Sequence, residues 1–288
     1  MIRLAVRCPP ELAEAVLAEL LVLAPGGVEE DEGKGYVEYA IYGVPGEVPD
    51  LGPLKATVLN KAIGRPAAGE EQPALIDVSS TEVPDDWAER WVDFHKPVLV
   101  GERVRIRPSW EPATDDEVMD IVVDPGQAFG TGAHPTTRLA IELLLELASE
   151  GRAGGAIADW GTGSGVLAIA AAKLGWSPVA GYDHEVAAIE AARGNAEENG
   201  VEIEFTRLNL RQETPPPAPT VTANLTSPIL IEMAPRLAAA ANDAPSTLVC
   251  SGMLAVETDS IAMAMAEAGF SETKRRVGGD WGAMLLER

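Results

Sequence analysis

Three glycines at alternating positions stand in the segment best suited to hold a ligand. Gly161, Gly163 and Gly165 follow a short apolar segment, residues 157–160, and precede a helix-like apolar stretch, residues 167–174. Glycine lets a turn adopt backbone angles that a Cβ forbids, and it lets a ligand approach the main chain. The helix behind the turn directs free N–H groups at that ligand. We therefore predict a strand, a ligand-binding turn and a helix here.

An acidic residue follows this turn at the distance expected of a nucleoside site. Asp183 comes 22 residues after Gly161, at the end of a predicted strand over residues 179–183. An acid at the end of the second strand of a βαβ unit binds ribose hydroxyls. Nicotinamide-binding turns read G-x-G-x-x-G, but here Val166 takes the place of the last glycine. A ligand with a ribose and no pyrophosphate suits this turn better, which indicates S-adenosylmethionine.

Composition limits the classes of partner. The 288 residues are 46% hydrophobic, enough for one large domain or two ordinary ones, and no apolar run is long enough to cross a bilayer. The formal net charge of −23 opposes direct binding of nucleic acid or an anionic membrane, and it favours a basic protein partner. Cys8 and Cys250 lie far apart and outside any metal-binding or redox spacing, so we expect a cytoplasmic protein without a metal site.

The first 82 residues are predicted to form a small α+β domain. Their pattern indicates, in order, a strand at 2–8, a helix at 10–22, a hairpin at 28–32 and 36–42, a weaker helix at 51–62 and a strand at 74–79. This β-α-β-β-α-β order is typical of a ferredoxin-like fold. The acidic run at residues 29–32 is expected to be a solvated edge, with a docking patch for a cationic partner as the alternative.

Residues 83–117 are predicted to connect this domain to the next and to pack on it. Trp87 and Trp91 are four residues apart and share one face of a helix, where we expect them to anchor the two parts of the molecule. A strand pair at residues 97–107 turns at Gly101. It carries three arginines on one face, which we expect to be solvated: Arg103, Arg105 and Arg107.

A long glycine-rich loop at residues 124–137 precedes the glycine turn. Pro135 begins the next helix and places Thr136 and Thr137 in its first turn, so that N–H groups and hydroxyls can converge near the later glycines. His134 is the only imidazole in this loop, and we expect it to make a structural hydrogen bond rather than to act as a base.

Residues 118–288 are predicted to form a doubly wound, Rossmann-like α/β domain. Asn224 stands at the end of the fourth strand, and ligands of open parallel sheets bind beyond the carboxyl ends of the strands. Gly161, Asp183 and Asn224 should therefore surround one crevice. A fifth strand at 247–252 and an antiparallel hairpin at 271–287 complete the seven-stranded sheet of a class I methyltransferase.

The motifs together resemble one family over essentially the whole chain. The similarity lies in the segments 85–91, 108–110, 124–137, 161–171 and 223–225, in this order. They resemble the methyltransferases of large-subunit ribosomal protein L11. The resemblance implies a hinged, two-domain enzyme that uses S-adenosylmethionine to trimethylate the α-amine and lysine side chains of that basic ribosomal protein. It also implies that the N-terminal domain, residues 1–82, recognises the substrate.

The resemblance further implies the cofactor contacts. The positions that match the family pattern are Thr137, Gly161, Asp183 and Asn224, and Phe129, Thr131 and Gly163 line the same pocket. Asn224 is expected to orient the target amine or the methionyl end of the cofactor. We assign no catalytic base. The segment after Asn224, residues 225–228, is more polar than the family pattern, and the first 80 residues match it only in the order of elements.

Two other classes of function remain open from the sequence. The first is a methyltransferase for another protein, a small molecule or a nucleic acid. Adenine-amine methyltransferases carry Asn-Pro-Pro-Tyr at the fourth strand, whereas residues 224–227 read Asn-Leu-Thr-Ser and lack the stacking aromatic residue. The second is a non-catalytic assembly factor that binds S-adenosylmethionine and transfers nothing.

Overall fold

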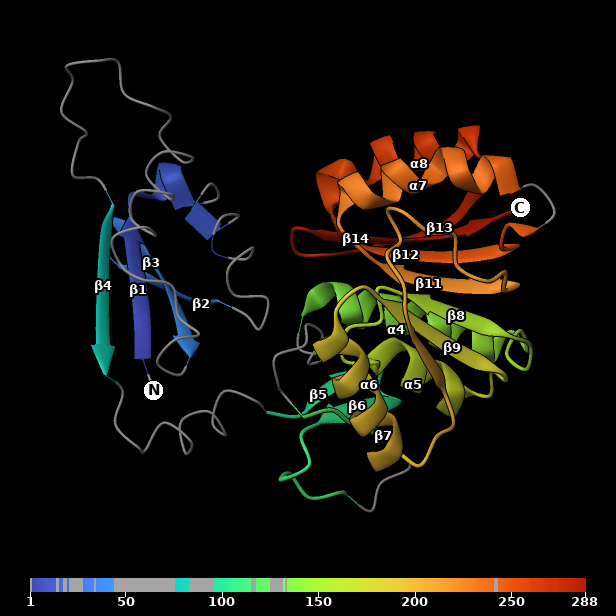
Figure 1. Cartoon of the computed structure of the whole chain (residues 1–288), viewed down its shortest axis with the longest axis horizontal. Coiled ribbons are helices and arrows are strands. Elements are labelled where there is room, and N and C mark those ends of the chain that lie inside the picture. The colour runs from blue at the N-terminus through green and yellow to red at the C-terminus, as the bar shows by residue number, and fades with distance from the viewer. Residues whose placement is uncertain are drawn as a thin grey trace. The chain divides into compact units, whose positions relative to one another are not determined.

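The computed structural model divides the chain into two compact units, residues 1–94 and 95–288. Within them it describes residues 2–13, 16, 17, 20, 28–33, 35–43, 76–82, 96–114, 118–124, 132, 134–240 and 243–288 (Figure 1). None of the helices in these ranges is both long and apolar enough to span a membrane.

The first unit contains an antiparallel sheet of order β2-β3-β1-β4. Its strands are β1 (Ile2–Cys8), β2 (Glu29–Gly33), β3 (Tyr36–Gly43) and β4 (Asp77–Glu82), and a 3-10 turn, η1, covers Pro10–Leu12. The first strand and the hairpin are confirmed. The last strand lies three residues later than 74–79, because β1 pairs with it from Ile2 opposite Glu82 to Arg7 opposite Asp77.

The second unit is built on a seven-stranded sheet of order β10-β9-β8-β11-β12-β14-β13. The first five strands of this order pair in parallel. β14 then pairs antiparallel with β12, and β13 pairs antiparallel with β14. In chain order the strands are β8 (Ile157–Trp160), β9 (Val179–Asp183), β10 (Glu204–Arg207), β11 (Thr220–Asn224), β12 (Thr247–Leu254), β13 (Ser271–Gly278) and β14 (Trp281–Glu287). This is the class I methyltransferase sheet that the sequence predicts.

Helices cover both faces of this sheet (Figure 1). On one face lie α4 (Pro135–Ser149), α5 (Val166–Leu174) and α6 (Val186–Glu198), which share one apolar core with the sheet. On the other face lie α7 (Ser227–Ala240) and α8 (Thr258–Glu267), with a second core. Helix α7 continues through Pro235.

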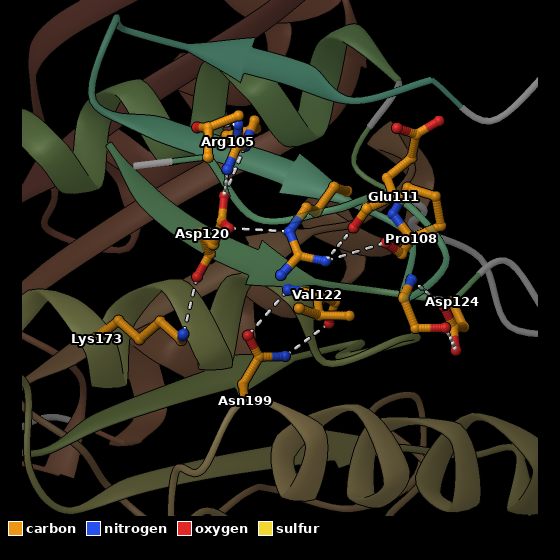
Figure 2. Close-up of polar contacts among 11 residues, drawn as sticks. Arg105, Pro108, Glu111, Asp120, Val122, Asp124, Lys173 and Asn199 are labelled. Atoms are coloured by element: carbon orange, nitrogen blue, oxygen red, sulfur yellow. Dashed lines mark hydrogen bonds and ion pairs between the residues drawn. The ribbon is translucent and has the colours of Figure 1, made fainter. Parts of the chain in front are cut away.

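A separate three-stranded sheet of order β5-β6-β7 packs in the first of these cores. β5 (Val98–Val100) and β6 (Val104–Arg107) form the expected antiparallel pair, and β7 (Met119–Val122) adds in parallel to β6. Arg103 is exposed, as expected, whereas the side chains of Arg105 and Arg107 are only 11% and 12% exposed and are not solvated. Figure 2 shows Arg105 turned toward Asp120, which accepts hydrogen bonds from Arg105 Nε (2.6 Å) and Arg107 Nε (2.9 Å).

Several expectations fall outside the described residues. They are the helix at 51–62, the tryptophans Trp87 and Trp91, and the two loop residues Phe129 and Thr131. Of the helix expected at 10–22, residues 14, 15, 18, 19, 21 and 22 also lie outside, whereas residues 13, 16, 17 and 20 are helical.

Candidate functional site

The glycine turn after β8 has the conformation that its sequence predicts. Gly161, Gly163 and Gly165 have φ angles of 75°, 52° and 82°, in the left-handed region that side chains disfavour. The N–H of Gly161 donates to Tyr182 O (2.8 Å), which joins the turn to β9. A Cβ on Gly161 would stand 2.4 Å from Leu225 Cδ2. The turn therefore needs glycine for its backbone angles, and a Cβ on Gly161 would also displace the end of the Leu225 side chain beyond β11.

Asp183 lies directly against this turn, at the end of β9. Its Oδ2 accepts the N–H of Gly163 (3.0 Å) and its Oδ1 accepts the N–H of Glu185 (3.1 Å). His184 Nδ1 lies 3.2 Å from Oδ1. These bonds fix the carboxylate in one orientation, and each oxygen keeps a further lone pair. Asp183 is 9% exposed, so it meets a ligand through one edge only.

Asn224 and Thr137 meet on the other side of the turn. β8 lies between β9 and β11 in the sheet, so Asn224 at the end of β11 stands at the same edge as Asp183. Its Nδ2 donates to Thr137 Oγ1 at 3.4 Å, in the first turn of α4. Thr137 is completely buried, and Asn224 Oδ1 is buried without a hydrogen-bond partner among the described residues. A buried acceptor without a partner is rare in proteins, and this oxygen can accept a donor from a ligand.

His134 is the N-terminal cap of α4. Its Nδ1 accepts the N–H of Thr136 (3.4 Å) and lies 2.7 Å from Thr136 Oγ1, while its ring packs edge-on against Trp281. Burial, with a contribution from Arg138, lowers the pKa of His134 below its usual 6.5. The imidazole is therefore neutral near pH 7, as an accepting cap must be, and the structural role expected from the sequence agrees with this geometry.

Asp159, a residue to which the sequence analysis gave no role, joins the glycine turn to β11 through hydrogen bonds. It lies in β8, is 2% exposed, and accepts the hydroxyls of Thr162 in the turn (2.7 Å) and Thr222 in β11 (2.7 Å). Burial raises the pKa of Asp159 to about 6. The sequence feature that could have indicated this role is an acid inside an apolar strand, two residues before the first glycine of the turn.

Asn195 on α6 is a second residue that the sequence analysis missed. It is 8% exposed, and its Nδ2 donates to Ser164 O (2.8 Å) inside the glycine turn. Its Oδ1 accepts the N–H of Asp124 (3.4 Å), the first residue of the long glycine-rich loop of the sequence. One side chain thus joins the turn to the start of that loop.

Side chains from α5 and from the C-terminal cap of α6 bind the free edge of β7, shown in Figure 2. Alternate residues of β7 direct their backbone groups toward β6, because Met119 N and Val123 N donate to Arg103 O and Arg107 O at 2.9 Å each. The other backbone groups meet side chains. Lys173 Nζ donates to Asp120 O (2.8 Å), and Asn199 accepts Val122 N–H (2.9 Å) and donates to Val122 O (2.6 Å).

A cavity of about 690 Å³ lies elsewhere, around the amino ends of β8, β9 and β10. Its lining includes Ala156, Pro178, Arg193, Glu202 and Ala218. Despite its size we place the ligand at the opposite, carboxyl end of the strands. There the glycine turn, the oriented carboxylate and the Asn224 oxygen converge, as the donor and acceptor set of an adenosyl ligand with an amino-acid end requires.

Comparisons with known proteins show the family of the chain. The family model described as ribosomal protein L11 methyltransferase (PrmA) matches residues 56–288. A ribosomal protein L11 methyltransferase from Pelotomaculum thermopropionicum is 34% identical over 307 aligned residues, covering 98% of this chain and 97% of the relative. Its counterpart from Chloroflexus aurantiacus is 32% identical, covering 92% and 80%.

A solved structure gives the same result. The crystal structure of ribosomal protein L11 methylase from Lactobacillus delbrueckii subsp. bulgaricus is 30% identical, with a TM-score of 0.60, and the match covers 67% of this chain and 98% of that one. The chain belongs to the ribosomal protein L11 methyltransferase family and is an S-adenosylmethionine-dependent protein methyltransferase.

Proposed function

We propose that this enzyme methylates the α-amine and lysine side chains of ribosomal protein L11. The observation that carries the proposal is the convergence of Asp183, the glycine turn and the Asn224–Thr137 pair at three adjacent strand ends. The names of the relatives and the net charge of −23, which suits a basic substrate, support the choice of protein.

Different residues bind different parts of the cofactor. Asp183 accepts the ribose hydroxyls through the lone pairs that its backbone bonds leave free, and Gly161 and Gly163 let the ligand lie against the main chain. Asn224 Oδ1 accepts a donor from the methionyl end or from the target amine. Thr137 supports Asn224, and Phe129 and Thr131 are assigned to the same pocket on the family pattern alone.

The chemical demand on the protein is small, because S-adenosylmethionine supplies an activated methyl group. The cost lies in the proton of the acceptor. A lysine with a pKa of ~10.4 needs about 4.6 kcal/mol to become neutral at pH 7, whereas an α-amine with a pKa of ~7.7–8 needs about 1 kcal/mol. Desolvation in the crevice lowers the pKa of either amine further. Positioning and exclusion of water are therefore sufficient, and no dedicated base is assigned.

We further propose three parts for the chain: a recognition domain at 1–82, a connector at 83–117 and the catalytic domain at 118–288. The strand order β4-β1-β3-β2 with all pairs antiparallel supports a ferredoxin-like fold for the first. The pairing of β6 with β7, in one core with α4 and α5, supports packing of the connector on the catalytic domain.

Mass spectrometry of L11 after incubation with the enzyme and S-adenosylmethionine tests the proposal. We expect mass increases in steps of one methyl group on L11, and none with the Asp183→Ala variant, whose affinity for S-adenosylmethionine in calorimetry should fall about 10- to 100-fold. Unmodified L11 together with intact cofactor binding would support a non-catalytic factor instead. Modification of other cytoplasmic proteins in preference to L11 would change the substrate.

A deletion tests the recognition domain. Removal of residues 1–82 should abolish methylation of L11 and preserve cofactor affinity, because the core of the first unit shares no residue with the two cores of the second. Full activity of the truncated chain on L11 would assign recognition to the catalytic domain.

A further inference from the structure

Glu257 lies where the ends of two strands meet, next to the proposed acceptor side of the crevice. β12 neighbours β11 and runs parallel to it, so the 3-10 turn η3 (Ala255–Glu257) after β12 stands at the same edge of the sheet as Asn224. Glu257 Oε2 accepts the N–H of Leu254 (2.9 Å) and the hydroxyl of Ser227. Ser227 is three residues beyond Asn224 and 6% exposed. One carboxylate therefore joins both strand ends.

This carboxylate has no cation of its own within the described part of the chain. None of the ion pairs found there includes Glu257, and its second oxygen, Oε1, makes no hydrogen bond with a described residue. The nearby Asp259 differs, because its Oδ1 is paired with Arg275 Nη1 at 2.7 Å. Glu257 is thus an acid at this edge that is fixed in place and still able to pair with an incoming positive charge.

Two exposed apolar side chains precede Glu257 in the chain. Leu254 is 38% exposed and Val256 is 87% exposed, although both belong to the segment that turns over the end of β12. A lysine side chain combines four methylene groups with a terminal ammonium, and such a chain buries its stem on apolar surface while its head meets a polar group. A carboxylate in the same short turn as two exposed aliphatic side chains matches this shape and charge.

We propose that Glu257 binds the ammonium of the incoming target lysine, with Leu254 and Val256 receiving its aliphatic stem. The inference rests on the proposed function and adds a specificity residue to it. The role is capture, before the amine loses its proton, because a neighbouring carboxylate stabilises the charged form of an amine rather than the neutral one that attacks. Glu257 should accordingly affect the binding of substrate more than the rate of the bound complex.

The isosteric variant Glu257→Gln separates charge from structure. A glutamine oxygen still accepts the bonds from Leu254 N–H and the Ser227 hydroxyl, so η3 keeps its cap, whereas the negative charge is lost. Glu257→Ala removes both. Glu202→Gln, at an exposed position just before β10 and hence at the opposite end of the sheet, changes the net charge by the same amount and serves as the matched control.

The measurements use the full-length enzyme saturated with S-adenosylhomocysteine and a short peptide whose only cation is one lysine, in plain and Nε-acetylated form. We expect Glu257→Gln to weaken binding of the plain peptide about 3- to 10-fold and to leave the acetylated peptide unchanged. With L11 as substrate, KM should rise by a similar factor, with kcat and the cofactor Kd within about twofold of wild type. The Glu202→Gln enzyme should behave as wild type throughout.

The outcomes remain distinct. If Glu257→Gln binds the plain peptide as wild type does and only Glu257→Ala is impaired, Glu257 is a cap and the inference is wrong. If wild-type enzyme leaves L11 unmodified, the proposed function fails, whereas the peptide titrations, which need no turnover, still decide whether Glu257 binds lysine.

Discussion

The two ends of the central sheet differ in what they offer a ligand. The amino end holds a cavity of about 690 Å³, lined by prolines, alanines and scattered charges. The carboxyl end has glycines that keep the main chain open, an aspartate oriented by two backbone N–H groups and a buried amide oxygen without a partner among the described residues. The contrast is why we assign the ligand to the carboxyl end, where polar groups converge, and not to the larger empty volume at the amino end.

The largest expected effect concerns the energetic cost of the carboxyl end. Asp159 has a pKa of about 6 in the fold against 3.8 normally, a difference of about 2 units or roughly 3 kcal/mol. Because the folded pKa is the higher one, its contribution to stability is fully present below pH 4 and is lost as the pH rises through 6. Relative to Asp159→Asn, the wild type should lose roughly 3 kcal/mol of unfolding free energy between pH 4 and pH 7.

Urea unfolding of both proteins at several pH values measures this difference, and the variant subtracts the titration of every other acid. Two curves that run parallel across the range would show that the buried carboxyl carries no such penalty.

The next prediction compares two glycines that both have left-handed φ angles. Gly161→Ala places a Cβ 2.4 Å from Leu225 at the carboxyl end, whereas Gly200→Ala, with a φ of 63°, meets open space. We expect Gly161→Ala to weaken binding of S-adenosylmethionine about 10- to 100-fold, and Gly200→Ala to cost only about 1 kcal/mol of stability. Calorimetric titration and thermal unfolding measure the two effects, and equal cofactor affinities would remove the turn from the site.

A smaller effect is expected from the side chain that joins the turn to the loop. Asn195→Ala removes the bond to Ser164 O and the contact with Asp124 N, so the cofactor Kd should rise about 3- to 10-fold. The matched variant Asn199→Ala loses its bonds to Val122 and keeps the turn intact. Its cofactor affinity should stay within about twofold of wild type. The reverse order of the two variants would locate the support of the turn in β7.

The smallest effect should come from the amino end. Ala218→Leu adds apolar bulk to the cavity there, and we expect the Kd of S-adenosylmethionine to change less than about twofold. A loss of affinity comparable to that of Gly161→Ala would break the comparison, because it would place the ligand in the cavity.

Local patterns were enough to predict most of the second unit. The β8 strand, the glycine turn and the order of strands up to the final hairpin follow from short apolar segments, glycines and turn residues, which act over a few positions. Gly161, Asp183 and Asn224 were placed together because the ends of parallel strands share an edge. The strands and the glycine turn that position the candidate site were therefore predictable from the sequence.

Contacts between distant segments were not predictable in this way. Asn195 lies 31 residues from Ser164 and 71 from Asp124, and nothing in its own helix distinguishes it from other polar positions. The arginines of β6 were expected to be solvated because the addition of β7, with its Asp120, could not be read from their alternation. Glu257 resembled an ordinary surface acid until the end of β11 was found beside it.

The arrangement along β7 bears on how this protein avoids aggregation. An exposed strand edge is a template for the strand of another molecule. Here a side-chain amide, Asn199, satisfies both the N–H and the C=O of Val122, and Lys173 occupies the carbonyl of Asp120. A strand from another molecule would have to displace these side chains before it could pair with β7. The two side chains therefore protect this edge, as an additional strand would do.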